Sequence, residues 1–335
     1  MPELPEVEIT ARLLSAALAG ATVDSARAPG LATMQTFKPP LDALAGATLE
    51  RIERRGKMLL VWFAGGGLVT NEHPDGRAGL LIHLMSAGRL QLFEKRATMK
   101  DRTARIVVRM NGGADGFDGE RELRLKEFGT RQAAWGRLLR EDDVAADERL
   151  TTLGPEAWPD PPRLVAAGEA GDRTGERVAG AAAPTDADGA RDAPGGPRTM
   201  SLPPRRTLRG ALRDQRVIAG IGRRWADEVL WEAKIAPLRR AGDLDDDERA
   251  ALHAAIRDRL DAAITGYAET LKLPLKDKMP VPERVHGRAG EACPRCGDTI
   301  LAVHYESDEM AYCPTCQTGG KPYKDRRFSR LLKEG

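Results

Sequence analysis

Short apolar runs separated by turn residues dominate the chain between about residues 22 and 140. Glycine-rich breaks at 65–67 and 112–119 interrupt the series. Five of the runs lie at 58–63, 79–84, 89–93, 104–110 and 121–129. Runs of this length with regular breaks are typical of antiparallel strands in a sandwich or a barrel. The pattern therefore predicts a strand-rich first half.

A helical pattern precedes the first of these strands. Pro5 suits the first turn of a helix, and the carboxylate of Glu6 there meets the positive end of the helix dipole. Apolar residues then recur at helical spacing, at Val7, Ala11, Leu14 and Leu18. We predict a helix over residues 5–19.

The second half of the chain has a different composition. Of the 41 residues between 160 and 200, 22 are Ala, Gly or Pro, so this segment buries too little apolar surface to offset its ordering entropy. We predict a flexible insertion there. Residues 207–237 then contain two amphipathic helical stretches broken at the sequence AGIG, and residues 246–270 have the pattern of a third, long helix.

Composition and charge narrow the class of protein. Apolar residues make up 41% and charged residues 30% of the chain, and no run approaches the roughly 18 apolar residues of a membrane span. No charged leader with an apolar core precedes the first helix, so we expect a cytoplasmic protein. The net charge is only +2, but residues 201–240 hold ten Lys or Arg against four Asp or Glu. This segregation is typical of a phosphate-binding surface, although an ordinary solvated surface fits equally well.

The four cysteines of the chain are the strongest chemical signal. Cys293, Cys296, Cys313 and Cys316 form the pattern C-x2-C-x16-C-x2-C. Two close pairs separated by a hairpin's length can place four thiolates around Zn²⁺. Four thiolates leave no open position for a catalytic water, so we expect one structural zinc ion per chain. Disulfides or a redox pair are the alternatives, and a cytoplasmic location disfavours disulfides.

Four motifs together resemble the formamidopyrimidine-DNA glycosylase and endonuclease VIII family. They are MPELPEVE at the N-terminus, RRGKMLL at 54–60, DQRVIAGIG at 214–222 and the cysteine hairpin. The resemblance covers nearly the whole chain except 160–200. It implies an α+β fold with an N-terminal helix and an antiparallel β-sandwich, followed by a helical helix–two-turn–helix domain that ends in a zinc-binding β-hairpin. The implied parts are a catalytic domain (1–150), the insertion (160–200), a DNA-binding domain (201–285), a zinc finger (286–325) and a basic tail (326–335).

The resemblance also implies an enzyme, a bifunctional DNA glycosylase and abasic-site lyase of base excision repair. Removal of Met1 would leave Pro2 with a free secondary amine that forms a Schiff base with the deoxyribose, after which β- and δ-elimination cut the strand. Glu3 would be the proton donor. Lys57 would contact phosphate or donate a proton, and Glu6 matches a further acid of the site. An α-amine titrates near pH 8, so a fraction of it is nucleophilic at neutral pH.

The implied DNA contacts are spread over the chain: His83, Met85, Phe128, Gly222, Arg223, Arg224 and Lys321. Three positions depart from the family pattern. Arg223 stands where asparagine is usual, Glu127 replaces an arginine that faces the orphan base, and Met85 is one residue out of register. A carboxylate accepts hydrogen bonds where arginine donates them, so a preference for cytosine opposite the lesion is not expected.

The segment 272–288 is shorter than the loop that caps 8-oxoguanine in guanine-type members, so we favour oxidised pyrimidines and abasic sites as substrates. The expected partner is damaged DNA, without a membrane or a small-molecule cofactor, and the expected form is a nucleoid-associated monomer. The alternative is a damage- or structure-specific DNA-binding protein of the same fold that has lost base excision or acts only at abasic sites. A zinc-dependent hydrolase is a third class, which the four-thiolate pattern disfavours.

Overall fold

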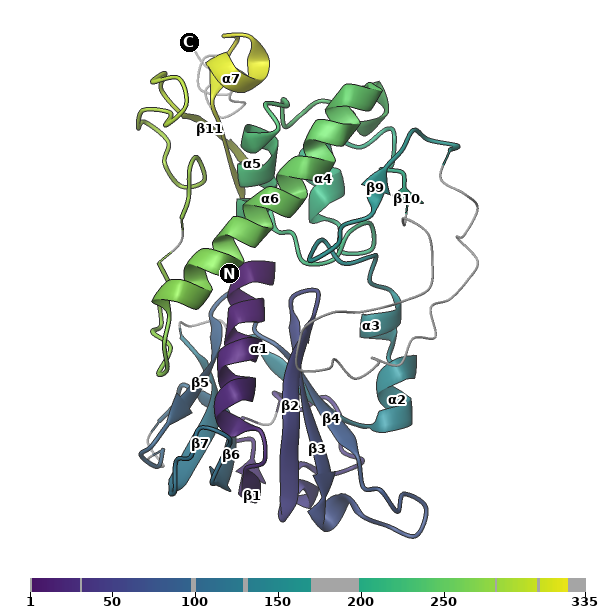
Figure 1. The fold of residues 1–335 in the computed structure, drawn as a ribbon, viewed down its shortest axis with the longest axis vertical. Coiled ribbons are helices and arrows are strands. Elements are labelled where there is room, and N and C mark those ends of the chain that lie inside the picture. The colour runs from purple at the N-terminus through teal and green to yellow at the C-terminus, as the bar shows by residue number, and fades with distance from the viewer. Residues whose placement is uncertain are drawn as a thin grey trace, which may run out of the picture. The chain divides into compact units, whose positions relative to one another are not determined.

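The computed structural model describes residues 2–30, 32–97, 101–128, 132–169, 199–280, 282–305 and 308–324 (Figure 1). These residues form two compact units. The first comprises residues 2–152 together with 264–279, and the second comprises the described residues of 153–169, 199–263 and 280–324. The two units are described in turn.

The first unit consists of one helix, an antiparallel sheet of eight strands and two short helices. The helix α1 (Leu4–Leu18) precedes the sheet, and α2 (Glu141–Ala146) and α3 (Glu148–Thr151) follow it. The strands are β1 (Thr22–Arg27), β2 (Ala47–Arg55), β3 (Met58–Gly65), β4 (Ala78–His83), β5 (Gly88–Phe93), β6 (Ala104–Asn111), β7 (Glu120–Glu127) and β8 (Trp135–Arg140). Their order in the sheet is β5-β7-β6-β1-β2-β3-β4-β8.

The apolar side chains that the strands bury in a common core explain how this sheet closes on itself. Each of the eight strands contributes buried apolar residues to one common core, for example Val23 of β1, Leu92 of β5 and Leu138 of β8. A flat sheet could not bring its two edge strands into one core, so the sheet bends over to enclose it. The predicted β-sandwich is confirmed.

The helix α1 packs its apolar stripe into the same core. Val7, Leu14 and Leu18 are fully buried there, and Pro5 occupies the first turn as predicted. The helix begins at Leu4 and ends at Leu18, one residue before each predicted boundary. Because the helix is anchored along its length, its N-terminal end, which carries Pro2 and Glu3, has a fixed place in the unit.

The second unit is mainly helical. Its helices are α4 (Leu208–Arg213), α5 (Arg223–Glu232), α6 (Asp246–Thr270), whose last turns belong to the first unit, and α7 (Pro314–Thr318). Its strands are β9 (Arg163–Leu164), β10 (Thr199–Met200), β11 (Leu301–Tyr305) and β12 (Asp308–Tyr312). β11 and β12 pair antiparallel, which confirms the predicted hairpin between the cysteine pairs. The predicted third helix at 246–270 matches α6.

The segment between α4 and α5 corrects the prediction in one respect. We expected two amphipathic stretches broken only at AGIG, but α4 ends at Arg213 and residues 214–222 form a longer turn. The side chain of Gln215 holds this turn, because it donates to the backbone oxygens of Arg213 (3.0 Å) and Ile221 (2.7 Å) and accepts from the N–H of Gly220 (3.0 Å). The apolar residues that looked helical are instead buried turn residues, among them Ile218 and Ile221.

Residues 170–198 of the predicted insertion and the predicted basic tail at 326–335 lie outside the described residues. On either side of 170–198, β9 and β10 pair in parallel, with Arg163 opposite Thr199 and Leu164 opposite Met200.

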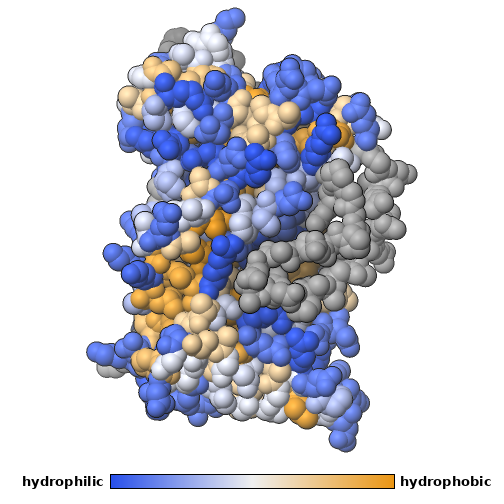
Figure 2. All heavy atoms as spheres, viewed as in Figure 1, coloured by the Kyte–Doolittle hydropathy of each residue, from blue (hydrophilic) through white to orange (hydrophobic). Residues whose placement is uncertain are grey.

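Apolar residues gather on the face of the first unit that carries α1 (Figure 2). Most of them are at least partly buried, because Phe37 and Val69 are the large apolar side chains found exposed among the described residues. None of the helices in the described ranges is long and apolar enough to cross a membrane.

Candidate functional site

The N-terminal end of α1 carries the two residues predicted to do the chemistry. Pro2 is half-buried and Glu3, which precedes the first helical residue, is only 2% exposed. Glu3 has extended backbone dihedrals, as an N-cap residue should. A carboxyl group therefore lies beside the proline in a site largely shielded from water.

Glu6 lies one turn into the helix and is 5% exposed. Its Oε2 accepts the backbone N–H of Glu3 (2.8 Å), and its Oε1 accepts the hydroxyl of Tyr267 (2.9 Å), which belongs to the same unit. Thr10 donates its hydroxyl to the backbone oxygen of Glu6 (2.7 Å). Nothing in the sequence pointed to Tyr267, because it is 261 residues away from Glu6 in the chain.

Lys57 stands in the two-residue turn between β2 and β3. Gly56 has a φ of +58°, a left-handed conformation that glycine adopts without steric cost, and this makes the tight turn possible. Arg54 holds the turn in place, because its guanidinium donates to Glu8 of α1 (2.8 Å) and to the backbone oxygen of Gly56 (3.1 Å). The ion pair places the Lys57 turn against α1, the helix that begins beside Pro2.

His83 ends β4, where it pairs with Met58, the residue after Lys57. Its ring stacks on Trp135 with the ring centres 5.6 Å apart, and the guanidinium of Arg149 covers the same tryptophan. Burial, helped by the positive charges of Lys57 and Arg149, lowers the pKa of His83 to about 4. The imidazole is therefore neutral at pH 7, and its Nδ1 accepts the backbone N–H of Met85 (3.0 Å).

Met85 has a φ of +51°, which is unusual for a residue with a side chain. The turn from β4 to β5 requires this conformation, since the N–H of Gly88 closes it on the backbone oxygen of Leu84 (2.8 Å). The family pattern has glycine before its methionine, and glycine suits a left-handed position. The register shift noted in the sequence thus places a methionine at the strained position of the turn.

Glu127, which stands where the family has an arginine, is held by the protein's own backbone. It is 1% exposed, and its carboxylate accepts the backbone N–H groups of Ala133 (2.8 Å) and Ala134 (3.0 Å). A buried carboxylate that is occupied by backbone donors cannot face a base. Phe128, the predicted wedge, is half-buried, and the ammonium of Lys126 lies 5.2 Å from its ring centre. Glu127 therefore holds the backbone at Ala133 and Ala134, just before β8.

In the second unit, the buried Gly222 is the N-cap of α5 and Arg223 is its first helical residue. Arg223 is about 39% exposed, with its guanidinium 3.7 Å from Asp308, and Arg224 pairs with Glu283 (2.7 Å). Lys321, beyond the cysteine hairpin, is exposed. The structure therefore keeps the predicted cations at or near the surface, with Arg224 already paired.

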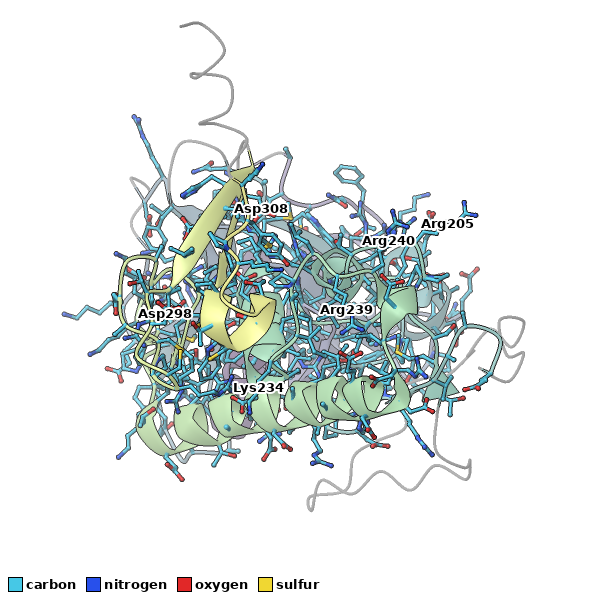
Figure 3. All side chains as sticks on the ribbon, turned by 90° about the horizontal axis from the view of Figure 1, so that it is seen from above. Arg205, Lys234, Arg239, Arg240, Asp298 and Asp308 are labelled. Atoms are coloured by element: carbon cyan, nitrogen blue, oxygen red, sulfur yellow. The ribbon has the colours of Figure 1, made fainter. Side chains whose placement is uncertain are left out.

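A buried ionic network joins α4 and α5 to the hairpin of β11 and β12. Arg209 donates to Asp227 of α5 (2.6 Å) and to Asp308 of β12 (2.8 Å). Arg213 also donates to Asp308, and His286 contacts the other oxygen of Asp227 (2.7 Å). Arg205 and Arg240, by contrast, are exposed and reach outward (Figure 3). Many arginines of the predicted basic segment thus serve packing, and its exposed members form the surface charge.

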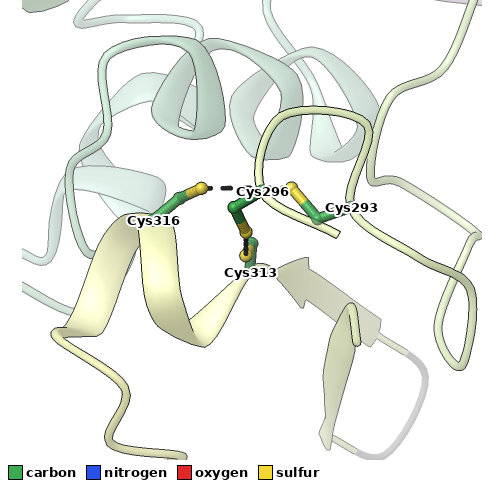
Figure 4. A group of neighbouring side chains, drawn as sticks. All are labelled: Cys293, Cys296, Cys313 and Cys316. Atoms are coloured by element: carbon green, nitrogen blue, oxygen red, sulfur yellow. Dashed lines mark hydrogen bonds between the residues drawn. The ribbon is translucent and has the colours of Figure 1, made fainter. Parts of the chain in front are cut away.

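The four cysteines point toward one another (Figure 4), with all four Sγ atoms within 4.8 Å of each other. The Sγ atoms of Cys293 and Cys316 are 3.9 Å apart and those of Cys296 and Cys313 are 3.5 Å apart. Four thiolates at the Zn–S distance of about 2.3 Å would stand about 3.8 Å apart in a tetrahedron. The group therefore fits a tetrahedral metal ion, as predicted.

Neighbouring donors support Cys293 as a thiolate. Its burial opposes ionisation, but the backbone N–H groups of Arg295 and Cys296 and the indole N–H of Trp231 outweigh burial and lower the pKa of the thiol to about 6. Trp231 belongs to α5, and the guanidinium of Arg295 stacks 3.9 Å from its ring centre. These contacts attach the metal centre to the helix that begins at Gly222.

Comparison with known proteins is consistent with this geometry. Residues 1–128 match the formamidopyrimidine-DNA glycosylase N-terminal domain, and residues 200–274 match the formamidopyrimidine-DNA glycosylase H2TH domain. The chain is 31% identical over 325 residues to a formamidopyrimidine-DNA glycosylase of Roseiflexus. The alignment covers 95% of this chain and all of the relative. It is 44% identical over 126 residues to an uncharacterised formamidopyrimidine-DNA glycosylase-like protein of Mycobacterium tuberculosis, covering 38% of this chain and 80% of that protein.

Solved structures of the same fold extend over almost the whole chain. MutM in complex with DNA that contains carbocyclic 8-oxo-G superimposes with a TM-score of 0.68 at 23% identity, covering 94% of this chain and 99% of the other. Fpg of Lactococcus lactis in complex with DNA that contains an abasic site gives 0.67 at 22% identity, with the same coverage. These likenesses establish the fold.

Proposed function

Because this chain belongs to the formamidopyrimidine-DNA glycosylase family, the DNA glycosylases with abasic-site lyase activity, we propose that Pro2 is its covalent nucleophile. The observation that carries the proposal is the start of α1, where Pro2 adjoins the buried carboxyl group of Glu3 and the anchored helix fixes both. Removal of Met1 would give Pro2 the free secondary amine that the reaction needs.

In the proposed reaction the Pro2 nitrogen forms a bond to C1′ of the deoxyribose while the bond from C1′ to the damaged base breaks. The Pro2 nitrogen loses its proton as the new bond forms, and the base leaves with a proton in its place. Glu3 protonates the ring oxygen, the sugar opens, and a cationic iminium joins Pro2 to C1′. The iminium acidifies the C2′ proton, whose loss expels the 3′ phosphate by β-elimination. The 5′ phosphate then leaves by δ-elimination.

The surroundings of Pro2 suit these steps. Glu6 holds the backbone of Glu3 by a hydrogen bond, and the Lys57 turn is fixed against α1 through Arg54 and Glu8. We assign Lys57 to the phosphate next to the lesion or to proton donation, since its ammonium group can do either. Neutral His83 is the last residue of β4, and the strained Met85 follows in the turn. We assign both to contacts with the damaged strand.

We assign DNA backbone binding to the second unit. The N-terminus of α5 at Gly222 offers a helix end that favours phosphate, and Arg223 and Lys321 add positive charge. Phe128 of the first unit would stack in the gap left by the flipped base. The chain would act as a monomer without a small-molecule cofactor.

The cysteine cluster fits one structural zinc ion per chain, held by Cys293, Cys296, Cys313 and Cys316. When bound, zinc would fix the hairpin of β11 and β12 and take no part in the chemistry, since four thiolates fill its coordination sphere. The hairpin would then present Lys321 to DNA.

We propose oxidised pyrimidines and abasic sites as the preferred substrates, on the shortness of segment 272–288. The relatives are named for formamidopyrimidine, a ring-opened purine, so both classes belong in the test. Incision of oligonucleotides that carry an abasic site, thymine glycol, dihydrouracil, 8-oxoguanine or formamidopyrimidine would rank them. Faster incision at 8-oxoguanine than at thymine glycol would overturn the pyrimidine preference.

Trapping with borohydride tests the nucleophile. The mature protein should become covalently attached to abasic DNA on reduction, and the chain with Pro2→Gly should be trapped at least about tenfold more slowly, because a primary amine does not give the permanently cationic iminium of proline. Val69→Ala, at an exposed apolar position of the first unit, is the control for the quality of the preparation. Equal trapping of a protein whose N-terminus is blocked would overturn the assignment.

A further inference from the structure

We infer that Tyr267 is a positioning residue for the Pro2 nucleophile, acting through the carboxylate of Glu6. The inference rests on the proposed function, because it concerns the placement of the attacking nitrogen. Tyr267 lies in the last turns of α6 and belongs to the same unit as α1.

Three buried groups are joined in sequence. The Tyr267 hydroxyl donates to Oε1 of Glu6 (2.9 Å), and Oε2 of Glu6 accepts the backbone N–H of Glu3 (2.8 Å). Tyr267 and Glu3 are each 2% exposed and Glu6 is 5% exposed. The two oxygens of the Glu6 carboxylate accept from two different segments of the chain. The Tyr267 hydroxyl therefore limits rotation of the carboxylate that accepts the Glu3 amide.

The Glu3 amide transmits this restraint to Pro2. A peptide unit is planar, so the N–H of Glu3 shares its plane with the carbonyl carbon and the Cα of Pro2. Only the rotation about the Cα–C bond of Pro2 separates that plane from the proline nitrogen, because the ring fixes the rest. A hydrogen bond that fixes the plane of the Glu3 amide therefore restricts the orientation of the Pro2 nitrogen.

A small misalignment of reacting atoms slows a reaction much more than it weakens binding. A displacement of about 1 Å can reduce a rate by about 100-fold. Loss of the Tyr267 hydroxyl leaves the other contacts of the first unit in place, so the expected effect falls on the covalent step and leaves DNA affinity nearly unchanged.

The test compares Tyr267→Phe with the wild-type chain on abasic DNA. We expect the single-turnover rate of borohydride trapping to fall about tenfold or more, while the Kd for DNA with a tetrahydrofuran abasic analogue stays within about twofold. Thr10→Val is the matched control, because it removes a hydroxyl that bonds the backbone oxygen of Glu6 and leaves its carboxylate alone. It should trap at the wild-type rate.

A double-mutant cycle shows whether Tyr267 acts through Glu6, which we call the relay, or whether the two residues act independently. Glu6→Gln loses one acceptor oxygen and so breaks one of the two links. If the relay operates, adding Tyr267→Phe to Glu6→Gln slows trapping by much less than Tyr267→Phe alone does. Fully multiplicative effects of the two substitutions would overturn the inference.

The outcomes also distinguish this inference from the proposed function. If the wild-type chain is not trapped, the proposed nucleophile is wrong and the inference falls with it. If the wild-type chain is trapped and Tyr267→Phe is trapped as fast as Thr10→Val, the nucleophile stands and the positioning role of Tyr267 is wrong. Equal losses of rate and of DNA affinity would show a general structural role and would likewise contradict the inference.

Discussion

Glu127 offers a direct test of how the backbone at Ala133 and Ala134 is held. The substitution Glu127→Gln keeps the size of the side chain but removes its charge and one acceptor oxygen. In the wild-type chain Oε1 accepts from Ala133 and Ala134, and Oε2 also accepts from Ala134. In the variant an NH₂ group would face the backbone N–H of Ala134, donor against donor, in a site that is 1% exposed.

The expected loss follows from these contacts. A hydrogen bond to a charged group contributes about 1.5–3 kcal/mol and a neutral one about 0.5–1.5 kcal/mol, so two weakened bonds cost about 2 kcal/mol. The buried amide that gains no acceptor adds about 1 kcal/mol. We expect the free energy of unfolding to fall by about 2–3 kcal/mol, or Tm by roughly 4–12 °C for a unit of this size.

Calorimetric unfolding of the variant measures this loss, and Glu120→Gln on the same strand is the control. Glu120 is about 31% exposed and pairs with the exposed Arg96, so its replacement should change stability by less than about 1 kcal/mol. Incision opposite each of the four bases should keep the wild-type order in Glu127→Gln, because the carboxylate does not face DNA. A loss below about 0.5 kcal/mol, or a changed order of opposite bases, would refute the reasoning.

Three further predictions follow from the sites described above. Met85→Gly should raise the free energy of unfolding by about 0.5–1 kcal/mol, as thermal unfolding would measure. The substitution relieves a left-handed conformation that costs about 1–2 kcal/mol, whereas the larger loss of chain entropy of glycine costs only about 0.5–1 kcal/mol. The pKa of His83 lies near 4 in the folded chain and near 6.5 in the unfolded chain, so the free energy of unfolding should fall as the pH drops from about 6.5 to 4. In the His83→Gln variant, denaturant titrations should show a smaller fall of the free energy of unfolding over the same pH range. Cys313→Ser should reduce bound zinc well below one ion per chain by elemental analysis, with a parallel loss of DNA affinity, whereas full zinc content would contradict the four-thiolate site.

The elements of this fold were largely predictable because their signals are local. Short apolar runs between turn residues located five of the strands, and the helical stripe located α1 to within one residue at each end. The cysteine spacing is equally local and indicated the metal centre. The turn at 214–222 was misjudged because buried turn residues such as Ile218 and Ile221 have the same apolar pattern as a helix.

The contacts that organise the sites were not predictable, because they join residues far apart in the chain. Tyr267 and Glu6 are separated by 261 positions, and Arg209 and Asp308 by 99. The surroundings of Glu127 were not predictable for a related reason. The sequence shows that a carboxylate replaces an arginine, but only the return of the chain at Ala133 and Ala134 shows that backbone donors occupy it.

The parallel pairing of β9 with β10 has a practical consequence. Leu164 and Met200 are brought together by this short ladder, and the N–H of Val165 extends it to the backbone oxygen of Met200 (3.0 Å). The ladder holds residues 165 and 199 close together, and loop-closure entropy changes slowly with loop length. A peptide tag or a fluorescent label could therefore be spliced between residues 165 and 199 with little thermodynamic penalty, giving repair assays a reporter whose attachment point is set by the fold.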